Sequence, residues 1–293
     1  MKICGKISEI KKHLKTEKAK GLTIGFVPTM GYLHEGHLSL VRESLKMTDK
    51  TVVSIFVNPT QFGPREDYQQ YPRNIQRDTA ILEELGVDYL FVPAVEEMYP
   101  SGYKTYVEVT DLQNKLCGRS RPGHFRGVCT IVLKLFNIIQ PDWSFFGQKD
   151  AQQAIIIQKM VEDLNLETKI KVLPIVRDKD GLALSSRNTY LSPTERKAAL
   201  ILYKSLQLAR QLFIAGEKKA TLIKQAMIDL IHQEPLAKID YVAIVKMENF
   251  EELEIITDKA LVAVAVFIGQ VRLIDNIILS EKEKTHEKNN AKK

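Results

Sequence analysis

The 293-residue sequence is poor in cysteine and has no long apolar run. Its three cysteines, Cys4, Cys117 and Cys129, follow no pattern, which argues against a disulfide framework and favours a reducing compartment. No apolar stretch approaches the roughly 18 residues of a membrane-spanning helix. Residues 1–6 contain no apolar segment and no cleavage site, so we expect no signal peptide. These absences predict a cytoplasmic protein without a membrane partner.

Several catalytic and binding signatures are missing as well. No serine lies in a Gly-x-Ser-x-Gly turn, and no pair of carboxylates stands out. The net charge is +6, and the tail 281–293 supplies +2 of it, from five lysines minus three glutamates. This tail is almost free of apolar residues, so we expect it to be disordered. No arginine-rich stripe with interleaved aromatic residues is present, so we expect no nucleic-acid partner.

The most informative stretch that is present runs from Pro28 to His37. It follows an apolar run that predicts a buried strand, 22–27, and precedes residues with helical periodicity, 38–45. The first turn of a helix has unpaired N–H groups and roughly half a positive charge, which suits a phosphate. His34 and His37 are three residues apart and would project from one helix face. The stretch therefore predicts an anion-binding turn that carries two imidazoles.

Other interpretations of the two histidines are possible from the sequence. Histidines near a helix start are often surface residues or capping partners. A zinc site would need further ligands, and no cysteine lies nearby. A phosphate-binding P-loop would need Lys followed by Ser or Thr where His37 and Leu38 stand.

Alternating strand and helix patterns up to about Val176 predict an α/β fold, a Rossmann-like doubly wound parallel sheet. We expect this domain to span residues 1–177. A long helical stretch from Ser192 to about His232, with a break at Gly216, and three strand-like runs follow. With a hairpin at Gly269-Gln270, they predict a smaller C-terminal α+β domain over 178–280.

Ligands of doubly wound sheets bind beyond the carboxyl ends of the strands. Two further polar segments fall there, Gly147–Asp150 and the loop that contains Ser185, Ser186 and Arg187. A lysine and an arginine at such positions can bind phosphate, although each could also be an ordinary surface residue. Their convergence with the histidines predicts a site for a triphosphate, built to stabilise charge rather than to form a covalent intermediate.

Six blocks of sequence together resemble the pantoate–β-alanine ligase family of H-x-G-H nucleotidyltransferases. The blocks are 27–37 (VPTMGYLHEGH), 56–62 (FVNPTQF), 71–73 (YPR), 121–128 (RPGHFRGV), 146–153 (FGQKDAQQ) and 184–188 (LSSRN). They cover nearly the whole chain except the lysine-rich tail. Gln148 departs from the family pattern, where many members have Glu.

The resemblance implies an enzyme that joins pantoate to β-alanine through a pantoyl adenylate, with release of pyrophosphate and then AMP. It implies catalytic roles for His34, His37, Lys149, Ser185, Ser186 and Arg187, with His37 as the acid. It implies that ATP contacts Met30, Gly31, Tyr32, Leu33, His34, Glu35, Gly36, His37, Gly147, Gln148, Lys149, Asp150, Val176, Leu184, Ser185, Ser186 and Arg187. Pantoate is expected at Gln61, Gln153 and Tyr71, with β-alanine beside Gln61. Mg²⁺ would come with ATP and touch Asp78.

The resemblance further implies a homodimer in which residues 178–280 close over the site as a lid. Two alternatives have different chemistry. One is an H-x-G-H adenylyltransferase that acts on a phosphorylated acceptor and makes a dinucleotide. The other is a nucleotide-sensing or RNA-binding module without catalysis, which would bind RNA with a steep salt dependence.

Overall fold

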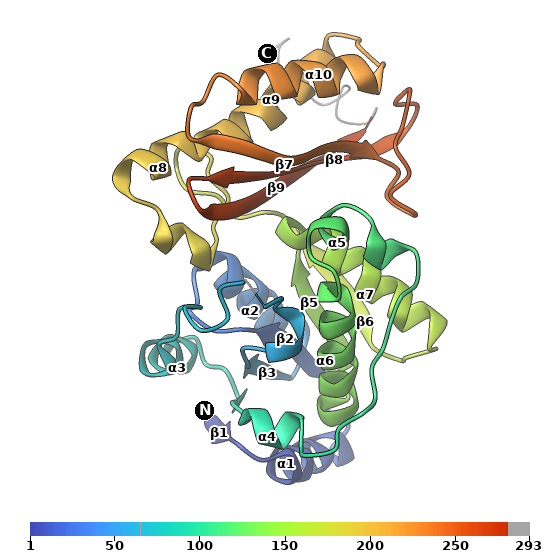
Figure 1. Cartoon of the computed structure of the whole chain (residues 1–293). Coiled ribbons are helices and arrows are strands. Elements are labelled where there is room, and N and C mark those ends of the chain that lie inside the picture. Colours follow the sequence, from blue (N-terminus) through green and yellow to red (C-terminus); the bar gives the residue numbers. More distant parts are fainter. Residues whose placement is uncertain (65, 281–293) are drawn as a thin grey trace, which may run out of the picture. The chain divides into compact units, whose positions relative to one another are not determined.

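The computed structural model describes residues 1–64 and 66–280, which form two units (Figure 1). The first unit comprises Met1–Asn114, Arg121–Val176 and Leu184–Ser186. The second comprises Lys115–Ser120, Arg177–Ala183 and residues 187–280. The predicted disordered tail, 281–293, lies outside the described residues.

A six-stranded sheet forms the centre of the first unit, and every neighbouring pair of its strands is parallel. The strand order is β1-β4-β3-β2-β5-β6. The bounds are β1 Lys2–Cys4, β2 Ile24–Thr29, β3 Lys50–Ile55, β4 Tyr89–Phe91, β5 Trp143–Gly147 and β6 Lys169–Leu173. Central strands such as β2 and β3 read as continuous apolar runs because both faces of the sheet are covered. The predicted doubly wound parallel sheet is confirmed.

Helices cover both faces of this sheet. They are α1 Ile7–Ala19, α2 Glu35–Met47, α3 Ile75–Glu84, α4 Val95–Met98, α6 His124–Ile139 and α7 Ala151–Asp163, with short 3₁₀ turns η1 Pro59–Gln61, η2 Leu112–Asn114 and η3 Gln148–Asp150. The crossovers β2–α2–β3 and β5–α7–β6 run in opposite directions from the middle of the sheet. Since such crossovers are right-handed, α2 and α7 lie on opposite faces. The order of the strands therefore reverses between β2 and β5, where a ligand crevice is expected.

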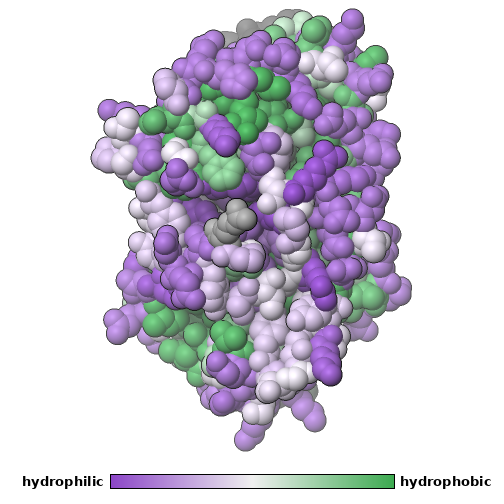
Figure 2. Space-filling view, viewed as in Figure 1, coloured by the Kyte–Doolittle hydropathy of each residue, from purple (hydrophilic) through white to green (hydrophobic). Residues whose placement is uncertain are grey.

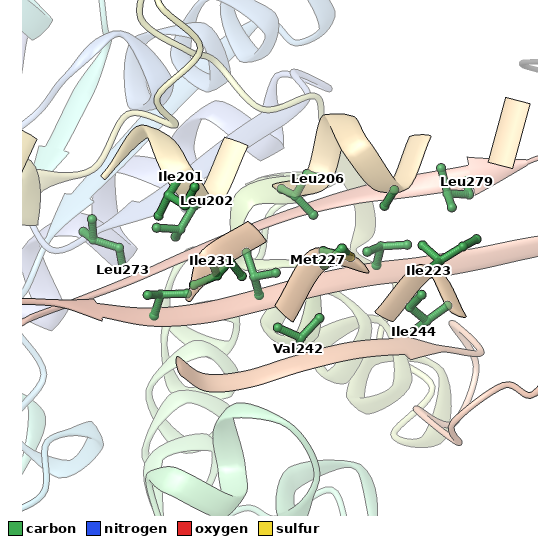
Figure 3. Packing of buried hydrophobic residues seen from close by; sticks show 14 of the residues in the cluster. Ile201, Leu202, Leu206, Ile223, Met227, Ile231, Val242, Ile244, Leu273 and Leu279 are labelled. Atoms are coloured by element: carbon green, nitrogen blue, oxygen red, sulfur yellow. The ribbon is translucent and has the colours of Figure 1, made fainter. Parts of the chain in front are cut away.

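The second unit has two layers, helices on an antiparallel sheet. Its elements are α5 Cys117–Ser120, η4 Ser186–Tyr190 (whose first residue belongs to the first unit), α8 Pro193–Ala198, α9 Leu200–Ile214, α10 Ala220–Ile231, β7 Ala237–Val245, β8 Lys259–Ile268 and β9 Val271–Ser280. The predicted hairpin joins β8 to β9, with Ile268 paired to Val271. Figure 3 shows how α9 and α10 pack their apolar side chains, such as Leu206 and Met227, onto the strands. The predicted smaller α+β part is confirmed.

Side chains on the face shown in Figure 2 are mostly hydrophilic, and the hydrophobic ones form separate patches. Few large apolar side chains are exposed among the described residues, and they come from different elements; Ile75, Leu164 and Leu222 are examples. None of the helices in residues 1–64 and 66–280 has the length and apolar character to cross a membrane.

Candidate active site

The turn between β2 and α2 has an unusual backbone. Gly31 has φ of +84° and Tyr32 has φ of +51°, so two successive residues are left-handed. Tyr32 has a steric cost there that glycine would avoid. The N–H groups of Tyr32 and Leu33 donate to the carboxylate oxygens of Asp78, at 2.6 and 2.9 Å. The turn then places His34 at the N-cap of helix α2.

His34 is the N-cap of α2, and its Nδ1 accepts the N–H of Gly36 at 3.1 Å. In return, the backbone N–H of His34 donates to Nδ1 of His37 at 3.4 Å. The ring centroids are 4.1 Å apart. Because each Nδ1 accepts a hydrogen bond, each neutral imidazole carries its proton on Nε2. Both histidines therefore have an Nε2–H available for a ligand oxygen.

Burial and positive charge keep both imidazoles neutral at pH 7. Burial, and then the charge of Lys149, lowers the pKa of His34 to about 4. The pKa of His37 lies well below its ordinary value, first because of burial and then because of His34 and Lys149. Lys149, which follows another strand, thus contributes to lowering the pKa of both histidines.

Lys149 belongs to η3, which follows the carboxyl end of β5. Its Nζ lies 3.7 Å from a carboxylate oxygen of Asp150, the N-cap of α7. Strands β2 and β5 are neighbours in the sheet, so the segment Gly147–Asp150 and the histidine turn occupy adjacent strand ends. This is the position where the strand order reverses, so two polar loops meet at the expected crevice.

The loop Leu184–Ser186 joins the same unit. The N–H of Leu184 donates to the carbonyl of Val176 at 3.0 Å. Ser186 is 6% exposed, and its hydroxyl donates to the carbonyl of Tyr32 at 3.4 Å. Ser185 is half-buried. Arg187, the next residue, belongs to the second unit, and its contact with a triphosphate stays a prediction.

Gln61, which is expected to bind pantoate, is held by contacts of both its side chain and its backbone. Its side-chain oxygen accepts from Asn58 Nδ2 at 3.1 Å, and its amide nitrogen lies 3.1 Å from the sulfur of Met30. Its backbone carbonyl lies 2.8 Å from Nδ1 of His124 and 3.4 Å from Arg121 Nη2. With only 8% of its surface exposed, Gln61 presents its amide in one orientation.

The remaining expected contact residues have varied surroundings. Tyr71 is buried, with its ring 5.9 Å from that of Phe62. Gln153 is half-buried on α7, next to a buried Gln152 that donates to the Leu112 carbonyl. The Glu35 carboxylate is paired with Arg42 at 2.8 Å along α2.

Asp78 does not fit a direct magnesium ligand. Its side chain is 1% exposed, and each of its oxygens already accepts a backbone N–H. Among the described residues, three metal-ligating side chains come together at Cys4, Glu9 and His13, a group on β1 and α1 that does not include Asp78. We therefore derive no catalytic step through Asp78 and a metal ion.

Sequence reasoning did not assign roles to Arg77, Asn58, Arg121 and His124. Three of them lie in quoted sequence blocks and Arg77 lies beside Asp78, but their contacts reach residues 44 to 69 positions away in the chain. No local pattern identifies such partners, because the fold brings them together.

Comparisons with known proteins agree with the resemblance seen in the sequence. The family model described as "Pantoate-beta-alanine ligase" matches residues 2–278. A pantothenate synthetase from Pelotomaculum thermopropionicum is 57% identical over 281 residues, which is 96% of this chain and 100% of that protein. A pantothenate synthetase from Thermotoga neapolitana is 57% identical over 279 residues, covering 95% of this chain and all of that protein.

Solved structures show the same similarity. Pantothenate synthetase from Thermus thermophilus superposes with a TM-score of 0.90 at 44% identity, covering 94% of this chain and 99% of that one. A pantoate-beta-alanine ligase from Francisella tularensis, complexed with beta-gamma ATP and beta-alanine, gives a TM-score of 0.78 at 37% identity, with 95% and 97% coverage.

Proposed function

The chain belongs to the pantoate–β-alanine ligase family, and from this premise we propose that it uses ATP to condense pantoate with β-alanine. The observation that carries the proposal is the meeting of His34, His37 and Lys149 at adjacent strand ends. Two neutral Nε2–H donors and one ammonium group suit a polyphosphate. The Francisella tularensis relative was solved with beta-gamma ATP and β-alanine, which supports the same pair of ligands here.

In the first step, a carboxylate oxygen of pantoate attacks the α-phosphorus of ATP. The bond from that phosphorus to the bridging oxygen breaks, and pyrophosphate leaves with the electron pair. Negative charge grows on the phosphate oxygens, and donors fixed before the reaction stabilise it most effectively. We assign this role to His34, His37 and Lys149, together with the Ser185 and Ser186 hydroxyls and the Arg187 guanidinium.

His37 is also proposed as the acid for this step. In the ligand-free chain its lowered pKa makes it a hydrogen-bond donor rather than a proton source. The charge of bound ATP favours the protonated imidazole and raises the pKa of His37. The added proton takes Nδ1, in place of the hydrogen bond from the His34 N–H, and His37 can then pass its Nε2 proton to the leaving pyrophosphate.

In the second step, the amine of β-alanine attacks the acyl carbon of pantoyl adenylate. The carbon–oxygen bond to the phosphate breaks, AMP leaves, and the amine loses a proton. A carboxylate does not react with an amine directly, so adenylation supplies the leaving group. We assign Gln61 and Gln153 to pantoate, with Gln61 also beside β-alanine, and Tyr71 to the same substrate region. The anchoring of Gln61 by Asn58 supports this assignment.

Other features follow from the family alone and are part of the proposal. Mg²⁺ arrives as the Mg²⁺–ATP substrate. The protein works in the cytoplasm as a homodimer, and residues 178–280 form a lid that keeps water from the adenylate. Sedimentation of the purified chain tests the dimer, since a monomer at micromolar concentration would contradict it.

ATP–pyrophosphate exchange with and without pantoate tests the function. We expect exchange only with pantoate, and AMP release only when β-alanine is added. A phosphorylated acceptor that replaces pantoate would instead support a dinucleotide-forming adenylyltransferase. Lys149→Ala should reduce exchange strongly, while Lys11→Ala, which changes an exposed lysine on α1, should not.

A further inference from the structure

The turn between β2 and α2 has an energetically unfavourable backbone. A left-handed backbone at Tyr32 is unfavourable for a side chain with a Cβ atom, and such positions persist only when their surroundings hold them. The turn must also keep the N–H groups of Tyr32 and Leu33 satisfied, because Leu33 is buried. The residues that stabilise this turn therefore also determine the position of His34, the N-cap of helix α2.

Asp78 satisfies both N–H groups with one buried carboxylate. It lies in the first turn of α3, where the positive end of the helix favours a negative side chain. That turn is itself fixed, because the Asn74 side chain accepts the N–H of Arg77 at 3.0 Å. The carboxylate is therefore held by a rigid element that lies 45 residues further along the chain than Leu33.

Arg77 holds the other side of the same turn. Its Nη2 donates to the carbonyl of Leu33 at 2.9 Å, and its guanidinium carbon lies 5.3 Å from the centre of the Tyr32 ring. The contact with the ring is a cation–π interaction. Adjacent residues of α3 thus bind the N–H groups, a carbonyl and the aromatic side chain of the turn.

We propose that Arg77 and Asp78 are positioning residues that set the catalytic geometry of His34, His37 and Ser186. Leu33 directly precedes His34, whose N–H holds His37. Tyr32 gives its N–H to Asp78 and its carbonyl to Ser186, so a shift of the turn moves both groups. The inference rests on the proposed function, and it replaces a magnesium role for Asp78 with a structural one.

Asp78→Asn tests the proposal, because an amide keeps the size but turns one acceptor into a donor that faces an N–H. Displacement of reacting groups by about 1 Å costs on the order of 100-fold in rate. We therefore expect kcat for ATP–pyrophosphate exchange to fall about 100-fold, while the Mg²⁺ concentration for half-maximal rate stays unchanged. The matched control is Asp142→Asn, since Asp142 accepts the N–H of Ile24 at 2.6 Å, at the start of β2. It should keep the parent kcat.

A second measurement does not depend on activity. The chain has six histidines, so their ring resonances can be assigned by NMR from single substitutions. The His34 and His37 resonances should shift in Asp78→Asn and stay in place in Asp142→Asn. If the parent enzyme shows no exchange, the proposed function fails, and the resonances still test the positioning role.

Two results would overturn the proposal. One is unchanged His34 and His37 resonances in Asp78→Asn. The other is a kcat that returns to the parent value at high Mg²⁺, which would make Asp78 a metal ligand. If Asp78→Asn does not fold, Arg77→Gln removes the Leu33 and Tyr32 contacts and the 3.5 Å ion pair with Asp78, keeps the Asp78 carboxylate, and should give the same shifts with a smaller loss of kcat.

Discussion

His34 and His37 are kept neutral mainly by burial, since desolvation is the largest cause of both lowered pKa values. The nearby Lys149 charge adds to this effect, whereas Asp150 acts in the opposite sense on His34. A site that lowers histidine pKa values in this way favours the binding of an anion. The negative charge of a bound phosphate offsets much of the unfavourable free energy of positive charges in this buried site. The protonation of the two imidazoles therefore depends on the charge of Lys149 and on any anion bound beside it.

His37→Ala is expected to slow adenylate formation by about two to three orders of magnitude, the usual effect of losing one fixed donor and acid. Single-turnover formation of pantoyl adenylate measures the step directly. His232→Ala, an exposed histidine at the end of α10, is the matched control and should leave the rate unchanged. Equal rates for the two variants would remove His37 from the mechanism.

The free energy of unfolding should depend on pH through His34. Its pKa is about 4 in the folded chain, below the ordinary 6.5, so the unfolded chain binds the proton more readily between these values. The contribution of His34 to the free energy of unfolding is complete above about pH 6.5 and is lost as the pH falls toward about 4. At about 1.4 kcal/mol per unit of pKa, the loss is at most about 3 kcal/mol.

Urea unfolding between pH 4.5 and 7 measures this dependence. His34→Asn removes the titrating ring but keeps a good N-cap side chain, so its unfolding free energy should change less over the same range. His232→Asn is the control and should follow the parent. If His34→Asn keeps the full slope, the pH dependence comes from other groups.

At the scale of secondary-structure elements, apolar runs and the helical spacing of apolar residues predicted the alternating strands and helices of the first unit. Strands β2, β3 and β5 are continuous apolar runs because the sheet is buried on both faces. Helix α2 was predicted from its spacing and begins at the expected turn. Strand β1, Lys2–Cys4, was not predicted, because a three-residue edge strand shows no period.

The candidate site was predictable only where its residues adjoin strand ends. His34 and Lys149 come soon after neighbouring strand ends, so the sequence could place them at one edge of the sheet, whereas Ser186 lies well beyond Leu173, the last residue of β6. The role of Asp78 could not be seen, because its partners are backbone N–H groups 45 and 46 residues away. A backbone donor leaves no signature in the sequence, which explains why a carboxylate near an ATP site suggests a magnesium ligand when only the sequence is considered.

Gly127 shows how one element fixes another. A Cβ atom at this position of α6 would lie 2.4 Å from the Thr60 carbonyl oxygen and 2.6 Å from the Gln61 nitrogen, both backbone atoms of η1. Gly127→Ala should therefore move η1 or α6, destabilise the protein by about 1–3 kcal/mol and weaken pantoate binding.

Calorimetric titration with pantoate and urea unfolding measure the two effects of Gly127→Ala. Gly5→Ala is the matched control, because a Cβ there would make only an ordinary contact, 3.7 Å from the Val92 carbonyl oxygen. Parent-like pantoate affinity in a destabilised Gly127→Ala would show that η1 does not position the substrate.

Among the described residues, each unit has a hydrophobic cluster of its own. The first unit packs Val27, Leu33 and Phe145 around the central strands, whereas the second packs α9 and α10 onto β7–β9. The sequence showed this division as a change from alternating strands and helices to helices followed by strands. It contained no sign that Lys115–Ser120 belongs with the second unit, because that grouping depends on contacts such as Cys117 with Tyr241.

Separate clusters predict separate responses to mutation and ligand. Trp143, the single tryptophan, lies in β5 and reports on the first unit by fluorescence, while far-UV circular dichroism reports on both units. Met227→Ala removes a fully buried side chain from the second cluster, at a cost of about 2–5 kcal/mol. Met227→Ala should lower the midpoint of the unfolding transition followed by circular dichroism and leave unchanged the midpoint followed by Trp143 fluorescence. ATP should raise the Trp143 midpoint, because it binds the folded first unit. Coincident shifts of both probes would mean that the chain unfolds as one cooperative body.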